Sequence, residues 1–369
     1  MNPYFNDPHG IGTREDPHAQ ARKARDQPLL LHSLSLFREV FAEVFAQREI
    51  STVVEIGVES GRVSGMYAEL GASAVHCVEP QPTDELRANL DGAELHLVEG
   101  TSPAVLDEIP VGDLYVIDGD HNYATLGKEL DWILTHAPDA VVVFHDLLWP
   151  CSRRDQYYQP SGLTAEETHP AGEDGPTVWH DDTTPAGFVG RGAFTAAREA
   201  GGERNGTLTA VEDALDRHAD DPWELTVVPA VFGLGVMARR SSPGAAALLE
   251  ALRPYSTSTL LEAMENNRIA LYTRVLQMQY EAVAHADAAD RLAMAVSAQN
   301  AELDGLRNEL DEAHARYDEQ VHRSLEEKRA LELEIAELRE RSPARVLKDV
   351  LRTVLLWPRR KWNSYEGRG

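Results

Sequence analysis

Short apolar runs alternate with amphipathic stretches along the first 150 residues of the chain. Five of these runs predict buried strands: Thr52–Ile56, Ala74–Val78, Leu95–Val98, Leu114–Ile117 and Val141–Phe144. The stretches between them have helical character: Val63–Leu70, Thr83–Leu90, Pro103–Glu108 and Tyr123–His136. A further amphipathic helix is predicted over Leu29–Gln47. Alternation of this kind predicts an α/β fold with a mostly parallel, doubly wound, Rossmann-like sheet.

The rhythm breaks after the fifth predicted strand. Residues 147–192 are rich in Pro, Gly and aromatic residues, and we expect a structureless loop that acts as a lid or substrate loop. A helix is then predicted over Thr209–His218. Two final strands, Trp223–Val228 and Val231–Ala238, are expected to close the sheet as an antiparallel hairpin.

The last third of the chain has a helical composition, with no proline from Ser256 to Arg341. One seven-residue register contains Leu303, Leu310, Tyr317, Leu331 and Leu338, and Ser324 interrupts it. This pattern predicts an imperfect coiled coil with a stutter, and therefore a homo-oligomer. The alternative is a long solvated single helix that packs on its own domain.

Four segments follow from these patterns. Residues 1–28 are expected to be a flexible N-terminal arm, 29–254 the α/β domain and 255–341 the long helix or coiled coil. Residues 342–369 form a basic amphipathic C-terminal segment, whose core is Ala344–Trp357. Such a segment suits either peripheral contact with a membrane surface or docking on a partner protein.

The charge is strongly acidic and unevenly spread. The chain of 369 residues has 35 Lys+Arg and 61 Asp+Glu, for a net charge of -26. Residues from 255 onward contribute -3 and residues 1–254 contribute -23, whereas 343–369 carry +5. Nucleic-acid binding is therefore not expected, because phosphate contacts need clustered Lys and Arg.

The expected location is the cytoplasm, with peripheral membrane contact through the basic segment as an option. The two cysteines, Cys77 and Cys151, make no disulfide framework, which indicates a reducing compartment. The N-terminal sequence is polar and is not typical of a secretory signal. No window of 18 consecutive apolar residues predicts a membrane-spanning helix.

A glycine-containing loop follows the first predicted strand. Residues 55–61 read E-x-G-x-x-x-G, in which Gly57 and Gly61 allow a sharp turn and the close approach of a ligand. The loop is not the dinucleotide fingerprint, and the carboxylates of Glu55 and Glu59 favour a cationic ligand over a pyrophosphate. Glu79, at the tip of the second strand, is placed to hold a ribose diol. These features predict S-adenosylmethionine (SAM) as the cofactor, and the alternative is an ordinary strand–helix turn.

Acidic and histidine residues follow the fourth and fifth predicted strands. Because the carboxyl ends of parallel strands meet at one rim, we expect these residues to gather beside the SAM loop: Asp118, Asp120, His121, His145 and Asp146. Three carboxylates and two imidazoles in one place need a compensating cation or substrate. A divalent metal would meet this need, and Mg²⁺ suits the oxygen ligands. Asp120 has the alternative of capping the following helix.

From about Leu34 to Arg239, and not in the tail, the sequence resembles the class I SAM-dependent methyltransferases. More narrowly, D-G-x-H at 118–121 resembles the metal-dependent branch that includes cephalosporin-cluster and macrolide-sugar O-methyltransferases. The resemblance implies that Asp118 and Asp146 are metal ligands and that His121 is the general base. We also expect Asp118 to contact the cofactor and His145 to be a metal ligand. His145 departs from the usual acidic pair. An imidazole suits transition metals better than Mg²⁺, so another divalent metal is the alternative.

The loop after the fifth strand supplies candidate substrate contacts. Aromatic, Arg and Asp side chains there are typical of a surface that binds a sugar or other polyol, and we expect five of them to contact substrate: Trp149, Arg153, Arg154, Tyr157 and Tyr158. The alternative is that they pin the loop to the domain. The hypothesis is thus a SAM-dependent O-methyltransferase acting on a hydroxyl of a sugar or glycosylated metabolite. The alternative from another class is a catalytically silent SAM-fold scaffold in a glycan-assembly complex.

Overall fold

A seven-stranded sheet forms the centre of the computed structural model, which describes residues 16, 18–26, 33–220, 222–340 and 343–362. The strand order is β3-β2-β1-β4-β5-β10-β9. The first five strands are parallel: β1 (Thr52–Ile56), β2 (Ala74–Glu79), β3 (Leu95–Glu99), β4 (Leu114–Ile117) and β5 (Val141–Phe144). The antiparallel hairpin β9 (Trp223–Val228) and β10 (Leu234–Arg239) completes the sheet beside β5. The predicted Rossmann-like fold class is confirmed.

Local pattern placed most strands within a residue of their observed bounds. β10 is the exception, because it begins at Leu234 and not at Val231. Val231 and Phe232 instead have positive φ angles of 45° and 65°. A β-branched and an aromatic residue rarely adopt this left-handed conformation, so apolar character alone could not reveal the turn.

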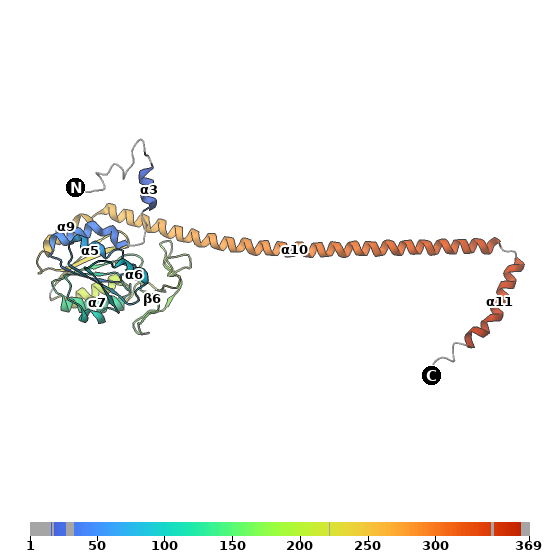
Figure 1. Cartoon of the computed structure of the whole chain (residues 1–369), viewed down its shortest axis with the longest axis horizontal. Helices are drawn as coiled ribbons and strands as arrows, with labels where there is room; N and C mark the ends of the chain where they lie inside the picture. The colour runs from blue at the N-terminus through green and yellow to red at the C-terminus, as the bar shows by residue number, and fades with distance from the viewer. Residues whose placement is uncertain (1–15, 17, 27–32, 221, 341–342, 363–369) are drawn as a thin grey trace. The chain divides into compact units, whose positions relative to one another are not determined.

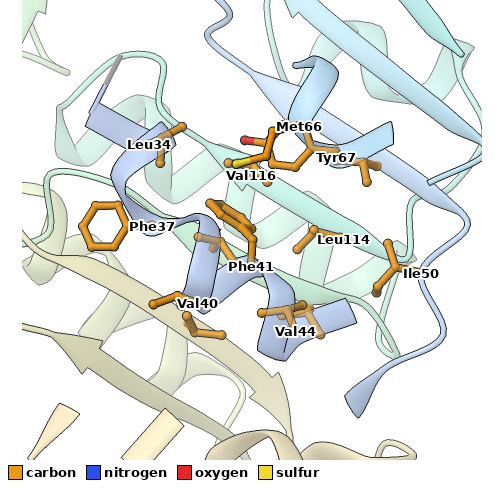
Figure 2. Close-up of a cluster of buried hydrophobic side chains, with 14 of the residues drawn as sticks. Leu34, Phe37, Val40, Phe41, Val44, Ile50, Met66, Tyr67, Leu114 and Val116 are labelled. Atoms are coloured by element: carbon orange, nitrogen blue, oxygen red, sulfur yellow. The ribbon is translucent and has the colours of Figure 1, made fainter. Parts of the chain in front are cut away.

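One face of the sheet is covered by helices from both ends of the catalytic part of the chain. These are η1 (Ser33–Phe37), α4 (Arg38–Gln47), α5 (Gly65–Leu70), α6 (Asp84–Asn89) and α9 (Ala245–Ser256). Phe41 of α4 is fully buried and lies among apolar side chains of α4, α5 and β4 (Figure 2). The predicted helix over Leu29–Gln47 is thus seen as η1 and α4 from Ser33 onward, and its first four residues lie outside the described residues.

The opposite face is covered by η2 (Ala104–Glu108), α7 (Tyr123–His136) and α8 (Thr207–Arg217). Figure 1 shows α7 on the side of the sheet away from α5 and α9. Leu130 and Ile133 of α7 are fully buried against strand residues such as Val142. Sandwiching the sheet between two helical layers buries both of its faces, which explains why β4 and β5 are apolar at every position.

Two short strands of the segment expected to be a structureless loop, residues 147–192, pair with a third strand just beyond it. Strands β6 (Gln156–Tyr158), β7 (Ala171–Gly172) and β8 (Phe194–Ala197) pair in the order β6-β8-β7. Asp155 anchors this small sheet: its buried carboxylate accepts hydrogen bonds from the Tyr123 and Gly206 amides and from the Tyr157 hydroxyl. The expectation of no secondary structure was therefore wrong, because the strands are too short to leave an alternating pattern.

The described residues form two compact units, up to Val283 and from Ala284 onward. The first unit, up to Val283, contains the seven-stranded sheet and is called the catalytic unit. The long helix α10 (Thr259–Glu340) spans the division, and its first turns belong to the catalytic unit. The second unit contains the rest of α10 and helix α11 (Pro343–Trp362). A short helix, α3 (Ala19–Asp26), lies within the predicted N-terminal arm. Among the described residues, no helix is long and apolar enough to cross a membrane.

Candidate active site

The candidate site lies where the strand order reverses. β1 has β2 on one side and β4 on the other, and the loops after β1, β4 and β5 leave the same edge of the sheet. In open α/β sheets, ligands bind at this edge beside the switch point. The sequence motifs singled out above therefore come together at the rim of the sheet, as expected.

The loop after β1 is tightly wound. Gly57 (φ 82°), Glu59 (φ 52°) and Gly61 (φ 72°) all have left-handed backbones. A Cβ at Gly57 would lie 2.4 Å from the Asp118 carbonyl oxygen, so this position requires glycine because β4's exit loop passes against it. A non-glycine residue at positive φ such as Glu59 is the kind of strain found at ligand sites.

Two of the acids predicted to bind the cofactor, Glu55 and Glu79, have different surroundings. Glu55 is 2% exposed, and its carboxylate accepts a hydrogen bond from the Ser64 hydroxyl. Burial raises the pKa of Glu55 to about 7, although the hydrogen bonds from Ser64 and Cys77 oppose the rise. Glu79 lies at the rim, where its carboxylate accepts hydrogen bonds from the amides of Val58 and Glu59 at 3.3 and 3.4 Å. Glu79 therefore holds the glycine-containing loop, and its cofactor role stays a prediction, as does that of Glu55.

Two carboxylates and two imidazoles meet at the ends of β4 and β5. The His145 Nδ1 atom lies 3.0 Å from Asp118 Oδ1 and 3.3 Å from Asp146 Oδ2. The His121 Nε2 atom lies 3.4 and 3.3 Å from the same two oxygens. Both histidines are buried. Four of the five expected rim residues thus form one cluster, whereas the Asp120 carboxylate accepts a hydrogen bond from Thr125 of α7 instead.

The hydrogen-bond partner of His145 shows which of its ring nitrogens carries a proton. Its Nε2 atom lies 3.0 Å from the carbonyl oxygen of Val231 and must donate, because a carbonyl only accepts. Nδ1 then faces two carboxylates. Burial would lower the pKa of His145, but the charges of Asp146 and Asp118 outweigh it and raise the pKa well above its usual range. For His121, burial is likewise outweighed by the charges of Asp146 and Asp118, and its pKa is raised. For Asp118, burial would raise the pKa, but the interactions with His145 and His121 outweigh it and lower the pKa.

This donor set fits a divalent cation. Asp118, His145 and Asp146 each offer a ligand atom, all within 4.8 Å of one another. The Nε2–H bond from His145 to a backbone carbonyl is the outer-shell contact that orients metal-ligating histidines. His121 Nε2 is buried without a well-aligned hydrogen bond, so the cluster has an unsatisfied polar atom directed at its centre. Two oxygens and one imidazole nitrogen suit Mg²⁺ or Mn²⁺, with the nitrogen favouring the latter.

Three of the five predicted substrate residues are engaged within the protein. Arg153 pairs with Glu212 of α8, and the buried guanidinium of Arg154 donates to the carbonyls of Ala197 and Arg198. The Tyr157 hydroxyl donates to Asp155 at 2.8 Å. These contacts pin the loop to the domain, which is what the alternative reading proposed, and a substrate role for the three stays untested.

Tyr158 and Trp149 are differently placed. Tyr158 is 40% exposed, and its ring centre lies 5.8 Å from that of His121 in an edge-to-face arrangement. The ring of Phe188 connects the two aromatic residues, through Phe194 on the Tyr158 side and directly on the Trp149 side. These four rings form an aromatic wall, which consists of Tyr158, Phe194, Phe188 and Trp149. The wall begins at His121 of the histidine cluster (Asp118, His121, His145 and Asp146) and follows the loop.

Sequence reasoning missed the residues that support the cluster. The Val231 carbonyl comes from a turn that was expected to be a strand, and Phe37, whose ring centre lies 6.1 Å from that of His145, comes from η1. A backbone carbonyl leaves no residue-type signal. The positive φ angles at Val231 and Phe232 would have been equally hidden, because both residues favour strands.

Residues 54–147 match the family model of a methyltransferase domain. The matched region runs from β1 through β5 and includes the glycine-containing loop and all four cluster residues. The predicted enzyme class, a SAM-dependent methyltransferase, is thereby confirmed for this domain. The match does not extend to the narrower D-G-x-H branch. No curated protein matches the chain.

Several solved structures resemble the chain. A putative caffeoyl-CoA O-methyltransferase from Staphylococcus aureus is 12% identical, covers 64% of this chain and 96% of its own, and has a TM-score of 0.35. An O-methyltransferase from Bacillus cereus in complex with SAH is 14% identical, with coverages of 60% and 88% and a TM-score of 0.36. The tomaymycin-synthesis O-methyltransferase from Streptomyces achromogenes, in complex with SAM, is 15% identical, with coverages of 60% and 86% and a TM-score of 0.34. Likenesses this distant assign no substrate to this chain.

Proposed function

We propose that the protein is a SAM-dependent O-methyltransferase that acts, with the help of a divalent metal, on a hydroxyl of a sugar or glycosylated metabolite. The observation that carries the proposal is the cluster of Asp118, His121, His145 and Asp146 beside the glycine-containing loop. A methyl donor and a hydroxyl activated at this cluster would meet at the same rim of the sheet.

Each group has a role in this proposal. Gly57, Glu59, Gly61 and Glu79 surround the expected SAM position, and Glu55 supports the loop from the core. Asp118, Asp146 and Nδ1 of His145 would hold the cation, which when bound supplies Lewis acidity toward a substrate hydroxyl. Nε2 of His121 faces the same two carboxylate oxygens, so it is within reach of a hydroxyl bound there and would accept its proton.

Protons and the metal compete for this cluster. The two carboxylates raise the pKa of both histidines, which favours their protonated forms, and a protonated His121 cannot act as a base. A cation held by Asp118, His145 and Asp146 would compensate the negative charge instead, and the pKa of His121 would then be lower. We therefore expect metal binding at pH 7 to release protons, which calorimetry in buffers of different ionisation enthalpy measures directly.

The acceptor class rests on the aromatic wall and on charge. Tyr158 contacts His121 of the cluster, and Trp149 is connected to Tyr158 through Phe188 and Phe194. Aromatic side chains of this kind suit the apolar side of a sugar ring. The net charge of -23 on residues 1–254 disfavours a polyanionic acceptor. Arg153 and Arg154 support the class less, because their guanidinium groups are already paired.

The decisive experiment measures cofactor, metal and turnover separately. S-adenosylhomocysteine (SAH) should bind the full-length protein, and Mn²⁺ should bind the wild type but not the Asp118→Asn variant. Methyl transfer from labelled SAM to a panel of glycosides and nucleotide sugars should be lost with EDTA and restored by Mg²⁺ or Mn²⁺. His121→Ala should abolish turnover while SAH affinity stays within about twofold, as expected for a group that acts after binding.

The outcomes separate the proposal from its alternative. Absence of SAH binding would refute the enzyme proposal. SAH binding without turnover on any hydroxyl acceptor would instead favour the catalytically silent scaffold. Turnover that EDTA leaves unchanged would remove the metal and keep the methyltransferase.

The tail adds proposals of its own. We infer that α10 associates with a second copy of the chain as a coiled coil and that α11 contacts an anionic membrane surface. In support, basic side chains lie next to an exposed apolar side of α11, at Arg345, Lys348 and Arg352. The exposed apolar residues on that side are Leu347, Val350, Leu351, Val354 and Leu355.

A further inference from the structure

The turn between β9 and β10 is held in a conformation that its own residues disfavour. Val231 (φ 45°), Phe232 (φ 65°) and Gly233 (φ 88°) are three consecutive residues in the left-handed region. Only the glycine adopts this backbone without steric conflict. Strain of this kind persists where surrounding contacts determine the conformation, so the turn needs an external support.

That support comes from the start of the long helix. One oxygen of the Glu265 carboxylate accepts a hydrogen bond from the Val231 amide at 2.9 Å, and the other accepts one from the Phe232 amide at 2.8 Å. Two successive amides that point at one anion form the concave arrangement that binds carboxylates well. Glu265 is 8% exposed, so water competes little for these bonds.

A second residue of α10, Arg268, also binds the turn, and Glu265 and Arg268 together form a clamp on residues 231–232. The Arg268 guanidinium binds both Glu265 oxygens, at 2.7 and 2.6 Å, and lies 4.2 Å from the centre of the Phe232 ring. The bidentate pair fixes the carboxylate, and the cation–π contact fixes the side chain of the turn. Backbone and side chain of the turn are thus both bound to the same helical segment.

The other side of the turn faces the histidine cluster. The Val231 carbonyl accepts the Nε2–H bond of His145 at 3.0 Å. The next two carbonyls, of Phe232 and Gly233, accept hydrogen bonds from the amides of Leu148 and Leu147 at 2.7 and 3.2 Å. Three consecutive carbonyls therefore bind the segment that contains His145 and Asp146. Asp146 itself has a positive φ of 56°.

We propose that Glu265 is a positioning residue for the active site: by clamping the 231–232 turn, it fixes the carbonyl that orients His145. The inference rests on the proposed function for its catalytic meaning, but its structural content does not depend on a bound cofactor or metal. The first turns of α10 are, on this proposal, a working part of the site and not a linker to the tail.

The test reads His145 and its segment directly in the full-length protein. In Glu265→Gln, an amide NH₂ must face one of the two backbone amides, which breaks half of the clamp. We expect the His145 ring Nε2 proton, assigned by NMR through its loss in His145→Asn, to exchange with solvent at least about tenfold faster. Deuterium uptake at the Leu147 and Leu148 amides should rise in parallel. Glu262→Gln, an exposed position one turn earlier on α10, is the matched control and should change neither.

A rescue variant distinguishes positioning from simple anchoring of the helix. In Glu265→Ala/Val231→Gly, the new glycine accepts the left-handed backbone without the clamp. The double variant should therefore regain slow exchange at His145 relative to Glu265→Ala. The inference is overturned if Glu265→Gln leaves the His145 proton and the 147–148 amides unchanged. It is equally overturned if exchange rises along α10 alone, or if Val231→Gly gives no recovery.

SAH calorimetry on the same variants keeps the two proposals apart. SAH should bind wild type and Glu265→Gln with affinities within about twofold, because the clamp lies on the side of the cluster away from the glycine-containing loop and acts through His145. Failure of the wild type to bind SAH would refute the proposed function and leave the exchange result intact. A normal SAH affinity with unchanged exchange would refute only the clamp.

Discussion

Individual residues at this rim are constrained by backbone geometry as much as by chemistry. Gly57 is the clearest case, because its positive φ and the backbone of Asp118 and Gly119 exclude any side chain. We predict that Gly57→Ala lowers the free energy of unfolding by about 2–4 kcal/mol and abolishes SAH binding. Urea unfolding and calorimetry measure the two effects.

Gly65, at the start of α5, provides the control for that substitution. A Cβ there would meet no atom within 4 Å. Gly65→Ala should be neutral or stabilise the protein by up to about 1 kcal/mol, with SAH affinity unchanged. If Gly57→Ala changes the free energy of unfolding and the SAH affinity as little as Gly65→Ala does, the rim of the sheet tolerates a side chain at Gly57.

Glu129 of α7 is a buried acid whose ionisation depends on folding. It is 1% exposed, its Oε1 atom accepts a hydrogen bond from Ser102, and its Oε2 atom has no hydrogen-bond partner. Burial raises the pKa of Glu129 to about 8, well above its ordinary value of 4.5. Between these two pH values the folded protein binds more protons than the unfolded chain, so stability falls as pH rises through this window.

Glu129→Gln removes this pH dependence. We predict that the free energy of unfolding of the variant, relative to wild type, increases by a few kcal/mol between pH 5 and pH 8. Urea unfolding at the two pH values checks this, with the exposed Glu108→Gln as the control. A constant difference between variant and wild type would mean that Glu129 is ionised in the folded protein.

At the scale of elements, the sequence predicted what periodicity records and missed what tertiary contacts impose. β1, β4, β5 and α7 have their predicted bounds because buried strands and an amphipathic helix leave direct patterns. The β6-β8-β7 sheet and the 231–233 turn depend on partners distant in the chain, such as Asp155 and Glu265. The cluster of Asp118, His121, His145 and Asp146 was predictable because its residues follow the ends of two neighbouring parallel strands. The contact between His145 and Val231 was not predictable, because Val231 lies in a turn distant in the chain.

Helix α11 is the element whose proposed partner lies outside the chain. We predict that the full-length protein floats with vesicles of phosphatidylglycerol and phosphatidylcholine, and that Leu351→Asp weakens this binding about tenfold or more. Thr353→Asp adds the same charge away from the apolar side and should have a much smaller effect. Equal binding to purely zwitterionic vesicles would argue against the cationic contribution, and no flotation would leave protein docking as the role of α11.

On the scale of the whole molecule, α10 displays an apolar seam that reaches back to the catalytic unit. Exposed residues share one heptad column at Val275, Val296, Leu303 and Leu310. The companion column contains Met264, Leu271, Met278, Leu292 and Leu306, all exposed. Two such columns are what a second helix would cover. The seam begins beside Glu265, so association would occur on the same segment that holds the 231–232 turn.

Substitutions within the seam test association. We predict that the full-length protein is an oligomer by light scattering and that Leu303→Glu/Leu310→Glu converts it to a monomer, because paired charges in adjacent core layers repel. Asn308→Glu, on the outer side of the heptad, should leave the mass unchanged. A monomeric wild type would favour the solvated single helix instead.

The position of Glu265 and Arg268 in the chain has a consequence for biosynthesis. Every strand of the sheet is made before this clamp, and roughly 100 residues of the sequence follow it. At ribosomal rates these take about 5–20 s to synthesise. Every residue of the histidine cluster and of its clamp is therefore synthesised before the rest of α10 is translated. The proposed coiled coil needs the rest of α10, so it would form only after the residues of both histidine clusters have been synthesised.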